Sequence, residues 1–386
     1  MGGGGMKVLL SAGMIQGGRS GVGRYVICLA EALASGHPEI ELHVAGLEQD
    51  RRCFPFIPDT RWVSIPARFG GGALNLLWHQ VCLPKLLRRE RVDVVHIPSY
   101  RRMLAFSPVR QVATIHDCAP FILREKYDFL RGVFGRMLVP WIARRVPRIL
   151  AVSDTTRDAI VRFMAVPPER VVTVYNGIDH GAFRPQSAEA VEVFRKRMNL
   201  TRPFFLYVAR LEHPAKNHVR LIEAFGRLVA AGEFDGELIL PGARWHGAEV
   251  VEAAVAASPA RERIRLEGFV DNRDLPLWYA AAEALVFPSL MEGFGLPLLE
   301  AQACGTRVAS ADSTSLPEVI GPAGLLFDGL DAASIRAALV RLATMAPEER
   351  ARREREGAAW AGRFTWQAHA RDAVANYHLA VEGTRS

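Results

Sequence analysis

Residues 284–300 constrain the fold of this chain most, because they change from an apolar run to a glycine loop and then to a helix start. The run 284–287 is short and apolar, as expected of a buried strand. Gly293 and Gly295 permit a tight or left-handed backbone. Pro297 suits the first turn of a helix. The sequence therefore predicts a strand, a loop and a helix in succession.

Two carboxylates flank this predicted helix start. Glu292 lies in the loop and Glu300 one turn inside the helix, so both can face the same mouth of a parallel sheet. A helix start offers free N–H groups and the positive end of the helix dipole, which together can hold a phosphate. Carboxylates that accept hydroxyls on either side of a diphosphate suit a nucleotide sugar. The alternative is a surface glutamate and a second one that only complements the dipole.

Two cations follow another predicted strand, residues 204–209. Arg210 and Lys216 occur in "VARLEHPAKN", and open α/β sheets bind ligands where strands end. An arginine can fork onto phosphate oxygens and a lysine adds a point charge, so the pair could stabilise a departing nucleoside diphosphate. Asn217 is expected to cap the helix that follows. Two solvated surface cations are the alternative.

The N-terminal half offers further polar groups at predicted strand ends. His116 and Asp117 directly follow the apolar run 112–115 and are expected to face a cleft, or else to form a capped turn. His96 also ends a strand, where a role in the core is favoured. The loop 13–23 precedes a helix but lacks the spacing of the dinucleotide fingerprint, so it predicts either phosphate contacts or a plain turn.

Several blocks resemble family 4 retaining glycosyltransferases, which have the GT-B fold. They are "TIHDCAPF", "AVSDTTRDAI", "VYNGIDHGAF", "LYVARLEHPAKNHVRLIEAF", "PSLMEGFGLPLLEAQACGTRV" and "SLPEVIGPAGLLF", in the order of that family and over nearly the whole chain. The resemblance implies a catalytic set of Arg210, Lys216, His116 and Glu292. It implies donor contacts from Gly21, Gly23, Phe269, Val270, Gly293, Phe294, Gly295, Leu296 and Glu300. It implies acceptor contacts from Asp117 and Ser153.

Short apolar runs that alternate with helical patterns predict a parallel α/β architecture. Strands are expected near 7–11, 41–45, 92–96, 111–115, 149–152 and 171–174, and again near 204–209, 237–240, 264–266, 284–287 and 307–310. With the resemblance, the expected fold is GT-B: two doubly wound, Rossmann-like domains with an interdomain cleft. The boundaries are 1–182 for the acceptor domain and 183–365 for the nucleotide-sugar domain. A last helix, 366–386, is expected to cross back to the first domain.

The predicted activity is transfer of a hexose, with retention, from a nucleotide sugar to a glycan or lipid-linked hydroxyl. GDP-mannose is favoured over a UDP-hexose by the likeness to bacterial polysaccharide mannosyltransferases. The sequence has no D-x-D, H-E-x-x-H or clustered Cys/His pattern, so no metal site and no cofactor are predicted. A nucleotide-sugar epimerase would need further acid/base carboxylates and no acceptor. A non-catalytic sensor would not need the intact set Arg210, Lys216, Glu292 and Glu300.

Charge is spread unevenly along the chain. Residues 1–182 hold 24 Lys and Arg against 15 Asp and Glu, and the remainder holds 24 against 26. Standard nucleic-acid motifs are lacking. Apolar and basic residues interleave over 121–148, which include Arg144, Arg145 and Arg148. A second basic stretch follows a group of apolar residues. The basic residues are Lys85, Arg88, Arg89 and Arg91, and the apolar ones are Leu74, Leu76, Leu77 and Trp78.

These two regions predict a peripheral enzyme at an anionic cytoplasmic leaflet, acting on a polyprenyl-diphosphate-linked or other lipid-linked glycan. A buried helix face with a solvated basic face is the alternative. The odd number of cysteines, five, and the lack of a C-x-x-C pair favour a cytoplasmic location.

Overall fold

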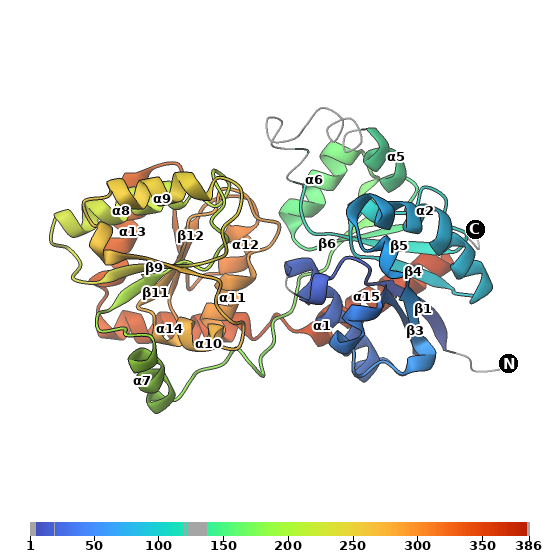
Figure 1. Ribbon diagram of the computed structural model, residues 1–386, viewed down its shortest axis with the longest axis horizontal. Coiled ribbons are helices and arrows are strands. Elements are labelled where there is room, and N and C mark those ends of the chain that lie inside the picture. Colours follow the sequence, from blue (N-terminus) through green and yellow to red (C-terminus); the bar gives the residue numbers. More distant parts are fainter. Residues whose placement is uncertain (1–4, 19, 119–120, 122–136, 384–386) are drawn as a thin grey trace. The chain divides into compact units, whose positions relative to one another are not determined.

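The computed structural model describes residues 5–18, 20–118, 121 and 137–383 (Figure 1). The chain forms two compact units. The first comprises Met1–Gly177 with Trp366–Ser386, and the second comprises Ile178–Thr365. Each unit is built on one parallel sheet with helices on both faces, which is the arrangement that alternating strands and helices favour.

The sheet of the first unit has the strand order β3-β2-β1-β4-β5-β6-β7, and all pairs are parallel. The order reverses its direction between β1 and β4, which marks the switch point where open α/β sheets bind ligands. The strands are β1 Met6–Ser11, β2 Ile40–Leu47, β3 Trp62–Ile65, β4 Val94–Ile97, β5 Arg110–Ile115, β6 Arg148–Ala151 and β7 Val171–Thr173.

The second sheet has the order β10-β9-β8-β11-β12-β13, again wholly parallel, with its switch point between β8 and β11. Its strands are β8 Phe204–Leu206, β9 Glu237–Pro241, β10 Ile264–Gly268, β11 Ala284–Phe287, β12 Val308–Ala311 and β13 Leu325–Phe327. The predicted strands of both sheets are present with small shifts of their ends. Two short strands, β3 and β13, were not predicted.

Alternation along β1 assigns the helices of the first unit to the two faces of its sheet. Val8 and Leu10 pack in one cluster with α1 and α15, whereas Leu9 packs in another with Trp78 of α2. Successive side chains of a strand point to opposite faces, so one apolar strand supports both layers. The α-helices that the structure describes in this unit are α1 Gly21–Gly36, α2 Gly72–Arg89, α5 Val139–Ala143, α6 Asp154–Met164 and α15 Trp366–Glu382.

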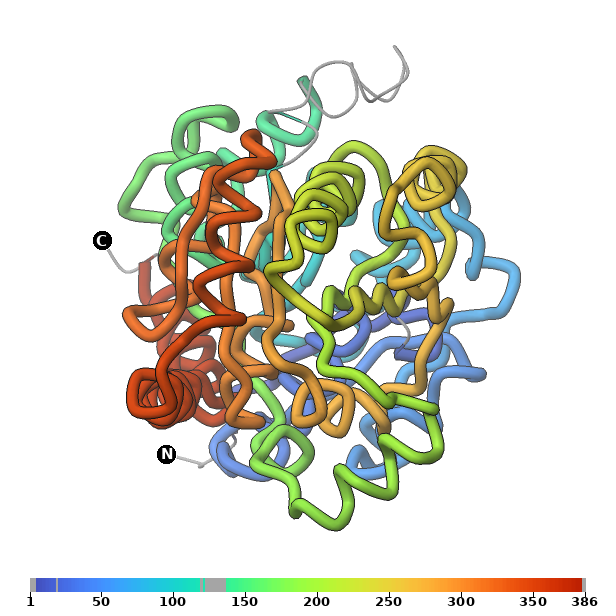
Figure 2. Tube along the Cα trace, turned by 90° about the vertical axis from the view of Figure 1, so that its left-hand side faces the viewer, coloured from blue at the N-terminus to red at the C-terminus, as the bar shows by residue number. Residues whose placement is uncertain are grey.

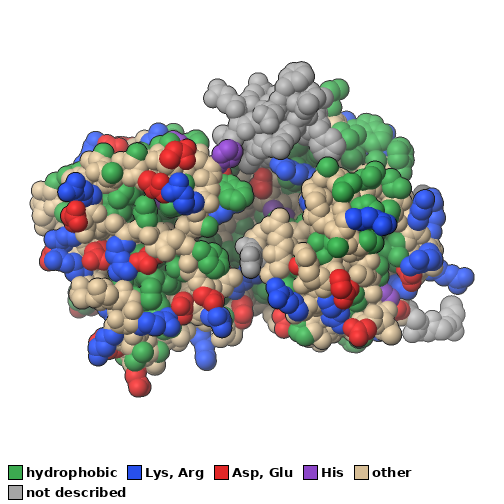
Figure 3. Space-filling view, in the orientation of Figure 1, with side chains coloured by type: hydrophobic (Ala, Val, Ile, Leu, Met, Phe, Trp, Pro, Cys, Tyr) green, Lys and Arg blue, Asp and Glu red, His purple; other side chains and the backbone are tan. Residues whose placement is uncertain are grey.

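In the second unit, α8, α9 and α13 pack together, as do α7, α10, α11 and α14 in a separate group (Figure 1). Figure 2 shows α8 and α9 side by side. The visible surface of this unit carries charged side chains of both signs, intermixed (Figure 3). The helices are α7 Ala188–Arg197, α8 His218–Ala230, α9 Ala248–Ala257, α10 Leu275–Ala281, α11 Leu296–Ala303, α12 Leu316–Ile320, α13 Ala332–Ala343 and α14 Pro347–Ala361.

The last helix, α15, belongs to the core of the first unit. Trp366, Ala370, Ala373 and Tyr377 are buried in the same cluster as the buried face of α1. Burying large side chains of this kind stabilises a fold by about 1.5–3 kcal/mol each. The chain therefore returns to the first unit through a well-packed helix.

No helix in the described part of the chain is long and apolar enough to cross a membrane. Of the basic, apolar stretch 121–148, residues 122–136 lie outside the described residues. Within its described remainder lie α5 and the first residue of β6.

Candidate active site

The glycine loop between β11 and α11 is held in one conformation by side chains of the neighbouring loop. Gly295 has φ of 109°, and a Cβ there would lie 2.9 Å from Leu316 Cδ2, so only glycine fits without strain. Ser315 Oγ lies within hydrogen-bond distance of the carbonyls of Glu292 and Phe294, at 3.1 and 3.0 Å, and its one proton is shared between them. Glu292 N donates to Thr314 Oγ1. The loop is therefore preorganised at the carboxyl end of β11.

Lys216 and Glu292 form the central ion pair of this site. Lys216 Nζ lies 2.6 Å from Glu292 Oε1, and their side chains are only 17% and 15% exposed. The strands that precede them, β8 and β11, are neighbours at the switch point of the second sheet. A cation is thus placed where the fold class binds ligands, and neither group is simply solvated.

Asn217 fixes the backbone next to Lys216, but not as the sequence predicted. Its side chain makes no capping hydrogen bond to α8. Instead Nδ2 donates to the carbonyls of Pro288 and Gly329, at 3.0 and 2.7 Å, while Arg220 donates to Oδ1. The residue itself has a left-handed backbone, with φ of 58°. The capping prediction was wrong because the amide is used to tie this turn to the end of β11.

Tyr207 also supports Lys216, and sequence reasoning missed it. Its buried hydroxyl donates to the Lys216 carbonyl at 2.8 Å and lies 2.8 Å from Ser289 Oγ. Burial raises the pKa of Tyr207 well above its ordinary value, so the hydroxyl stays a donor. A tyrosine at the end of a buried strand gives no sequence signal for such a role.

Arg210 is more accessible than Lys216. Its side chain is 52% exposed, and Nη2 lies 3.2 Å from Glu212 Oε2. The guanidinium stacks over the ring of Trp245 at 4.7 Å, a cation–π contact that limits its rotation. Arg210 is therefore oriented by two neighbours while part of its guanidinium remains open to solvent.

Glu300 is buried, being 6% exposed, and it accepts a hydrogen bond from Tyr279 Oη at 3.0 Å. Phe269 and Val270 follow β10, and the Phe269 side chain is 71% exposed. Because β8, β10 and β11 are parallel, Arg210, Lys216, Phe269 and Glu292 all follow strand ends at the same edge of the second sheet.

In the first unit, His116 and Asp117 follow the carboxyl end of β5. His116 packs edge-on against the ring of Tyr25, with centroids 4.6 Å apart, and its Nε2 is shielded from solvent without a hydrogen-bond partner. Burial lowers the pKa of His116 to about 4, so the ring is neutral at neutral pH.

Tyr25 belongs to a buried chain of hydrogen bonds that links α15 to the sheet. His369 Nδ1 lies 2.8 Å from the Tyr175 carbonyl, which can only accept. In a neutral His369, Nδ1 then carries the proton and Nε2 accepts a hydrogen bond from Tyr25 Oη at 2.9 Å. Because Tyr25 Oη donates its proton there, it must accept from Thr114 Oγ1 at 2.9 Å. The Tyr175 carbonyl at one end thus determines which atom donates in each hydrogen bond of this network.

The same chain continues through His96 to a second residue of α15. Thr114 Oγ1, having donated its proton, accepts from His96 Nε2 at 2.7 Å, and His96 Nδ1 accepts from Tyr377 Oη at 2.7 Å. Both imidazoles must be neutral for this pattern. Burial supports that state, since it lowers the pKa of His96 to about 3 and that of His369 to about 4. The sequence prediction of a core role for His96 is confirmed, whereas the other members were missed.

Three other predicted contacts have evident structural roles. Ser153 is fully buried, and its hydroxyl caps α6 by accepting from Thr156 N at 3.0 Å. Gly21 begins α1. A Cβ at Gly23 would lie 2.4 Å from the Ile15 carbonyl oxygen, so the loop packs too closely for any other residue.

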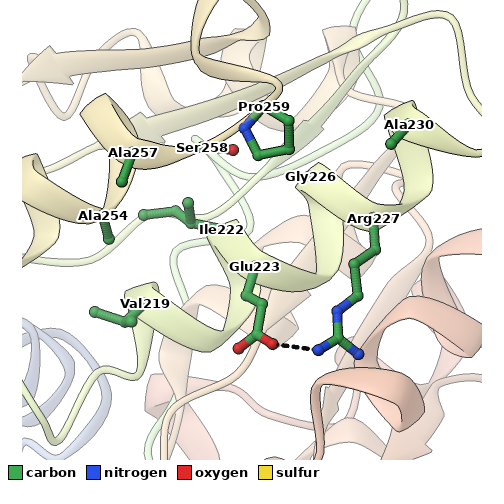
Figure 4. Close-up of a pocket in the computed structure, with 10 residues that line it drawn as sticks. All are labelled: Val219, Ile222, Glu223, Gly226, Arg227, Ala230, Ala254, Ala257, Ser258 and Pro259. Carbon is green, nitrogen blue, oxygen red and sulfur yellow. Dashed lines mark hydrogen bonds and ion pairs between the residues drawn. The ribbon is translucent and has the colours of Figure 1, made fainter.

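A separate groove lies between α8 and α9 (Figure 4). It encloses about 310 Å³ and is mostly apolar, with Ile222, Ala254 and Pro259 among its lining residues. None of the predicted site residues lines it. No cluster of three or more His, Cys, Asp or Glu able to hold a metal occurs among the described residues.

Two family descriptions match the chain. Residues 19–181 match Glycosyltransferase Family 4, and residues 202–345 match Glycosyl transferases group 1. The O-antigen chain mannosyltransferase B of Escherichia coli is 30% identical over 87% of this chain and 90% of its own length. The O-antigen chain mannosyltransferase RfbU of Salmonella typhimurium is 27% identical over 59% of this chain and 60% of its own.

Solved structures share the fold of the whole chain. Sucrose-phosphate synthase from Thermosynechococcus elongatus has a TM-score of 0.77 at 21% identity, covering 97% of this chain and 98% of its own. Anabaena HepE in complex with UDP and glucose has a TM-score of 0.76 at 17% identity, covering 96% and 98%. Two parallel-sheet units with these neighbours confirm the predicted GT-B fold. The chain therefore belongs to the family 4 glycosyltransferases of the GT-B fold.

Proposed function

We propose that this glycosyltransferase moves mannose from GDP-mannose to a glycan hydroxyl, with retention of the anomeric configuration, in polysaccharide biosynthesis. The observation that carries the chemistry is the Lys216–Glu292 pair at the switch point of the second sheet, with Arg210 beside the same strand end. The mannosyltransferase names of the relatives from Escherichia coli and Salmonella typhimurium support the donor sugar.

In the proposed reaction the acceptor oxygen forms a bond to C1 of the sugar while the bond from C1 to the phosphate oxygen breaks. The acceptor proton passes to the leaving phosphate on the same face of the sugar. Lys216 and Arg210 neutralise the charge that develops on the nucleoside diphosphate, and both are preorganised for this role before the donor binds. Because these groups supply positive charge, we propose that the reaction needs no added metal ion.

The remaining predicted residues hold the substrates. Glu292 and Glu300 would accept hydrogen bonds from donor hydroxyls, and Gly293, Phe294, Gly295 and Leu296 would present backbone N–H groups to the diphosphate. Gly21 and Gly23 would approach the phosphates, and Phe269 and Val270 would contact the base. His116, which follows the carboxyl end of β5, stays a prediction for contact with the donor sugar. Asp117 and Ser153 stay predictions for the acceptor.

A nucleotide-sugar screen with an acceptor panel tests this proposal. A ligand present at 100 times its dissociation constant adds about 2.7 kcal/mol to the stability of the folded protein, which a thermal shift detects. GDP-mannose should give a larger shift than UDP-hexoses, and its label should reach a glycan acceptor. An isomerised donor without acceptor would identify an epimerase, and a shift without turnover on the whole panel would identify a sensor.

We also propose that the enzyme works at an anionic cytoplasmic leaflet on a lipid-linked glycan. The supporting observation is one face of α2, on which Leu74, Leu77 and Val81 are 49%, 52% and 46% exposed. Lys85 and Arg88 continue this face at helical spacing and are also exposed. In Figure 3, hydrophobic side chains adjoin Lys and Arg over this part of the first unit.

We propose α2 as the basic contact with the leaflet in place of Arg144, Arg145 and Arg148, because these three arginines have local partners. Arg144 and Arg148 donate to the backbone carbonyls of Met164 and Glu169, and Arg145 stacks on Trp141 at 3.6 Å. Replacing these three residues would disturb local packing as well as charge. Exposed groups of α2 are the better probes of a surface contact.

Sedimentation with liposomes of graded anionic content tests the leaflet proposal. Binding should rise with anionic lipid, fall with salt, and weaken in a Leu74→Ser, Leu77→Ser variant, because both apolar burial and charge attract the helix. Val193→Ser, which changes an exposed apolar residue of the second unit, is the control. Absence of sedimentation at low salt, together with full activity on a water-soluble acceptor, would contradict the leaflet proposal and leave the transferase proposal intact.

A further inference from the structure

Arg102, at the end of the short 3-10 helix Tyr100–Arg102, is a partly buried cation without a counter-ion. It follows β4, and its Nε donates to Asn75 Oδ1 at 2.6 Å. Within the described residues, no carboxylate forms an ion pair with it, and neither terminal guanidinium nitrogen makes a hydrogen bond. Two donors in a planar fork are therefore available to a ligand.

Asn75 holds this guanidinium in a defined orientation. The amide is 1% exposed, and its Nδ2 donates to the carbonyls of Gly13 and Phe69, both at 3.0 Å. These two bonds identify the amide oxygen as the atom that faces Arg102. The Arg102 backbone is also fixed, since its N–H donates to the Ser99 carbonyl at 3.1 Å. The fork is thus preorganised by residues from three segments of the first unit.

A bound anion would stabilise the charged guanidinium of Arg102. Burial, with repulsion from Arg101, lowers the pKa of Arg102 to about 10, and the group remains protonated at neutral pH. A charge that is partly removed from water is costly unless it is paired. The neighbouring Arg101 differs from Arg102, because it is exposed and donates to Tyr100 Oη.

The position of Arg102 connects it to the substrate-binding edge of its sheet. Gly13 follows β1 and Arg102 follows β4, and these strands are paired at the switch point of the first sheet. The next strand, β5, is followed by His116 and Asp117. Ligands of open α/β sheets bind at the carboxyl ends of the strands near this point.

We propose that Arg102 binds an anionic group of the acceptor, through its two terminal nitrogens. This inference rests on the proposed transferase function and narrows its acceptor to a glycan that carries either a phosphate or a carboxylate near the accepting sugar. A phosphate would come from a phosphate- or diphosphate-linked glycan, and a carboxylate from an acidic sugar. Bidentate arginine contacts suit both groups.

Three matched acceptors separate these sources: a neutral glycan, the same glycan with a phosphate ester, and the same glycan with a carboxylate. Arg102→Gln should lower kcat/KM on the preferred anionic acceptor by roughly 10–100-fold, mainly through KM, because a hydrogen-bonded charge contact is lost. Its kcat/KM on the neutral acceptor should stay near the wild-type value. Arg101→Gln, which removes the adjacent exposed cation, should leave both values unchanged.

Arg102→Lys keeps the charge but loses the fork and the Nε bond to Asn75. It should retain part of the preference for the anionic acceptor, with an intermediate KM. Equal losses on neutral and anionic acceptors in Arg102→Gln would show that the residue only supports the fold, and would overturn the proposal.

A measurement that needs no turnover keeps the inference separate from the transferase proposal. The full chain is treated with phenylglyoxal, with and without inorganic pyrophosphate, and modification is assigned to individual arginines by peptide fragmentation. Pyrophosphate should slow modification of Arg102 several-fold and leave Arg101 unaffected. Lack of protection at Arg102 would overturn the anion site. Protection without transfer to any acceptor would keep the site and contradict the proposed transferase function.

Discussion

Lys216 donates a hydrogen bond of 2.6 Å to Glu292, a residue 76 positions later in the chain. The contact joins the loop after β8 to the loop after β11, two neighbouring strands at the switch point of their sheet. Both side chains are largely buried. We propose that a lysine held in this way would meet the diphosphate with little further loss of side-chain freedom, which is what preorganised charge stabilisation requires.

Arg210 should contribute to turnover without contributing much to stability. Arg210→Ala is expected to lower the transfer rate by about 10²–10³, the scale for losing one charge-stabilising group. The melting temperature of this variant should change little, since the Arg210 side chain is 52% exposed and its charge is largely screened by solvent. Paired measurements of initial rate and melting temperature check this. A wild-type rate would remove Arg210 from the mechanism.

Arg210 and Lys216 should act on the same diphosphate. The Arg210→Ala, Lys216→Ala double variant is therefore expected to lose less than the product of the two single losses. A complete double-mutant cycle of transfer rates measures the coupling. Strict additivity would indicate that the two cations act on separate groups.

Glu300→Gln should weaken donor binding while the free protein keeps its stability. The amide oxygen can still accept from Tyr279 Oη, so the buried hydrogen bond at 3.0 Å survives, but the negative charge that would attract hydroxyl protons is lost. Calorimetric titration with the nucleotide sugar gives the affinity. Tyr279→Phe is the matched control, because it removes the hydrogen bond and retains the carboxylate. Unchanged donor affinity in Glu300→Gln would assign the glutamate to packing alone.

The stability of the first unit should fall as the pH drops from about 6.5 toward 4. His96 and His369 are buried and neutral in the fold, with pKa values lowered to about 3 and about 4, whereas both protonate near 6.5 when unfolded. The unfolded state therefore binds more protons in this window, and stability rises with pH by roughly 1.4 kcal/mol per pH unit for each such histidine.

Replacing one of these histidines should reduce that slope. His369→Gln removes one titrating group from the buried chain, so its melting temperature should be lower at pH 7.5 but less sensitive to pH between 6.5 and 4. His378→Gln, an exposed position on the same helix, is the control. A wild-type slope in His369→Gln would contradict the assignment of a neutral His369.

Much of the fold could be predicted from the sequence because short apolar runs and glycine loops carry strong local signals. The run Ala284–Phe287 forms a strand with the predicted bounds, and Gly295 has the positive φ that its loop requires. The strands Trp62–Ile65 and Leu325–Phe327 were missed because each is very short and partly exposed at the edge of its sheet. Such edge strands are determined by pairing with a neighbour and not by their own pattern.

Part of the candidate active site could be predicted, because strand ends also carry a local signal in the sequence. Lys216 and Glu292 lie at strand ends, where the sequence signals a ligand site, and the fold brings them together. The contacts of Asn217, Tyr207 and His369 depend on which segments become neighbours only after folding. Residue type and spacing give no such information for a lone tyrosine or histidine, so these supporting groups required the structure.

Activity should survive an excess of chelator. Lys216 and Arg210 lie beside the strand end where the diphosphate is proposed to bind, and in the proposed reaction they would supply the positive charge that a divalent ion would otherwise provide. Initial transfer rates with EDTA, and with added Mg²⁺ or Mn²⁺, measure this. A loss with EDTA that either ion restores would contradict the proposed stabilisation of the leaving group.

The most direct test of the account is the transfer of labelled mannose from GDP-mannose to a glycan acceptor by the wild type and Lys216→Gln. Lys196→Gln, which changes an exposed lysine paired with Glu192 on α7, is the control. We predict label in the glycan for the wild type and the control, and a rate about 10²–10³ lower for Lys216→Gln. Label that remains in the nucleotide sugar, or an undiminished rate in Lys216→Gln, would contradict the central role of the Lys216–Glu292 pair.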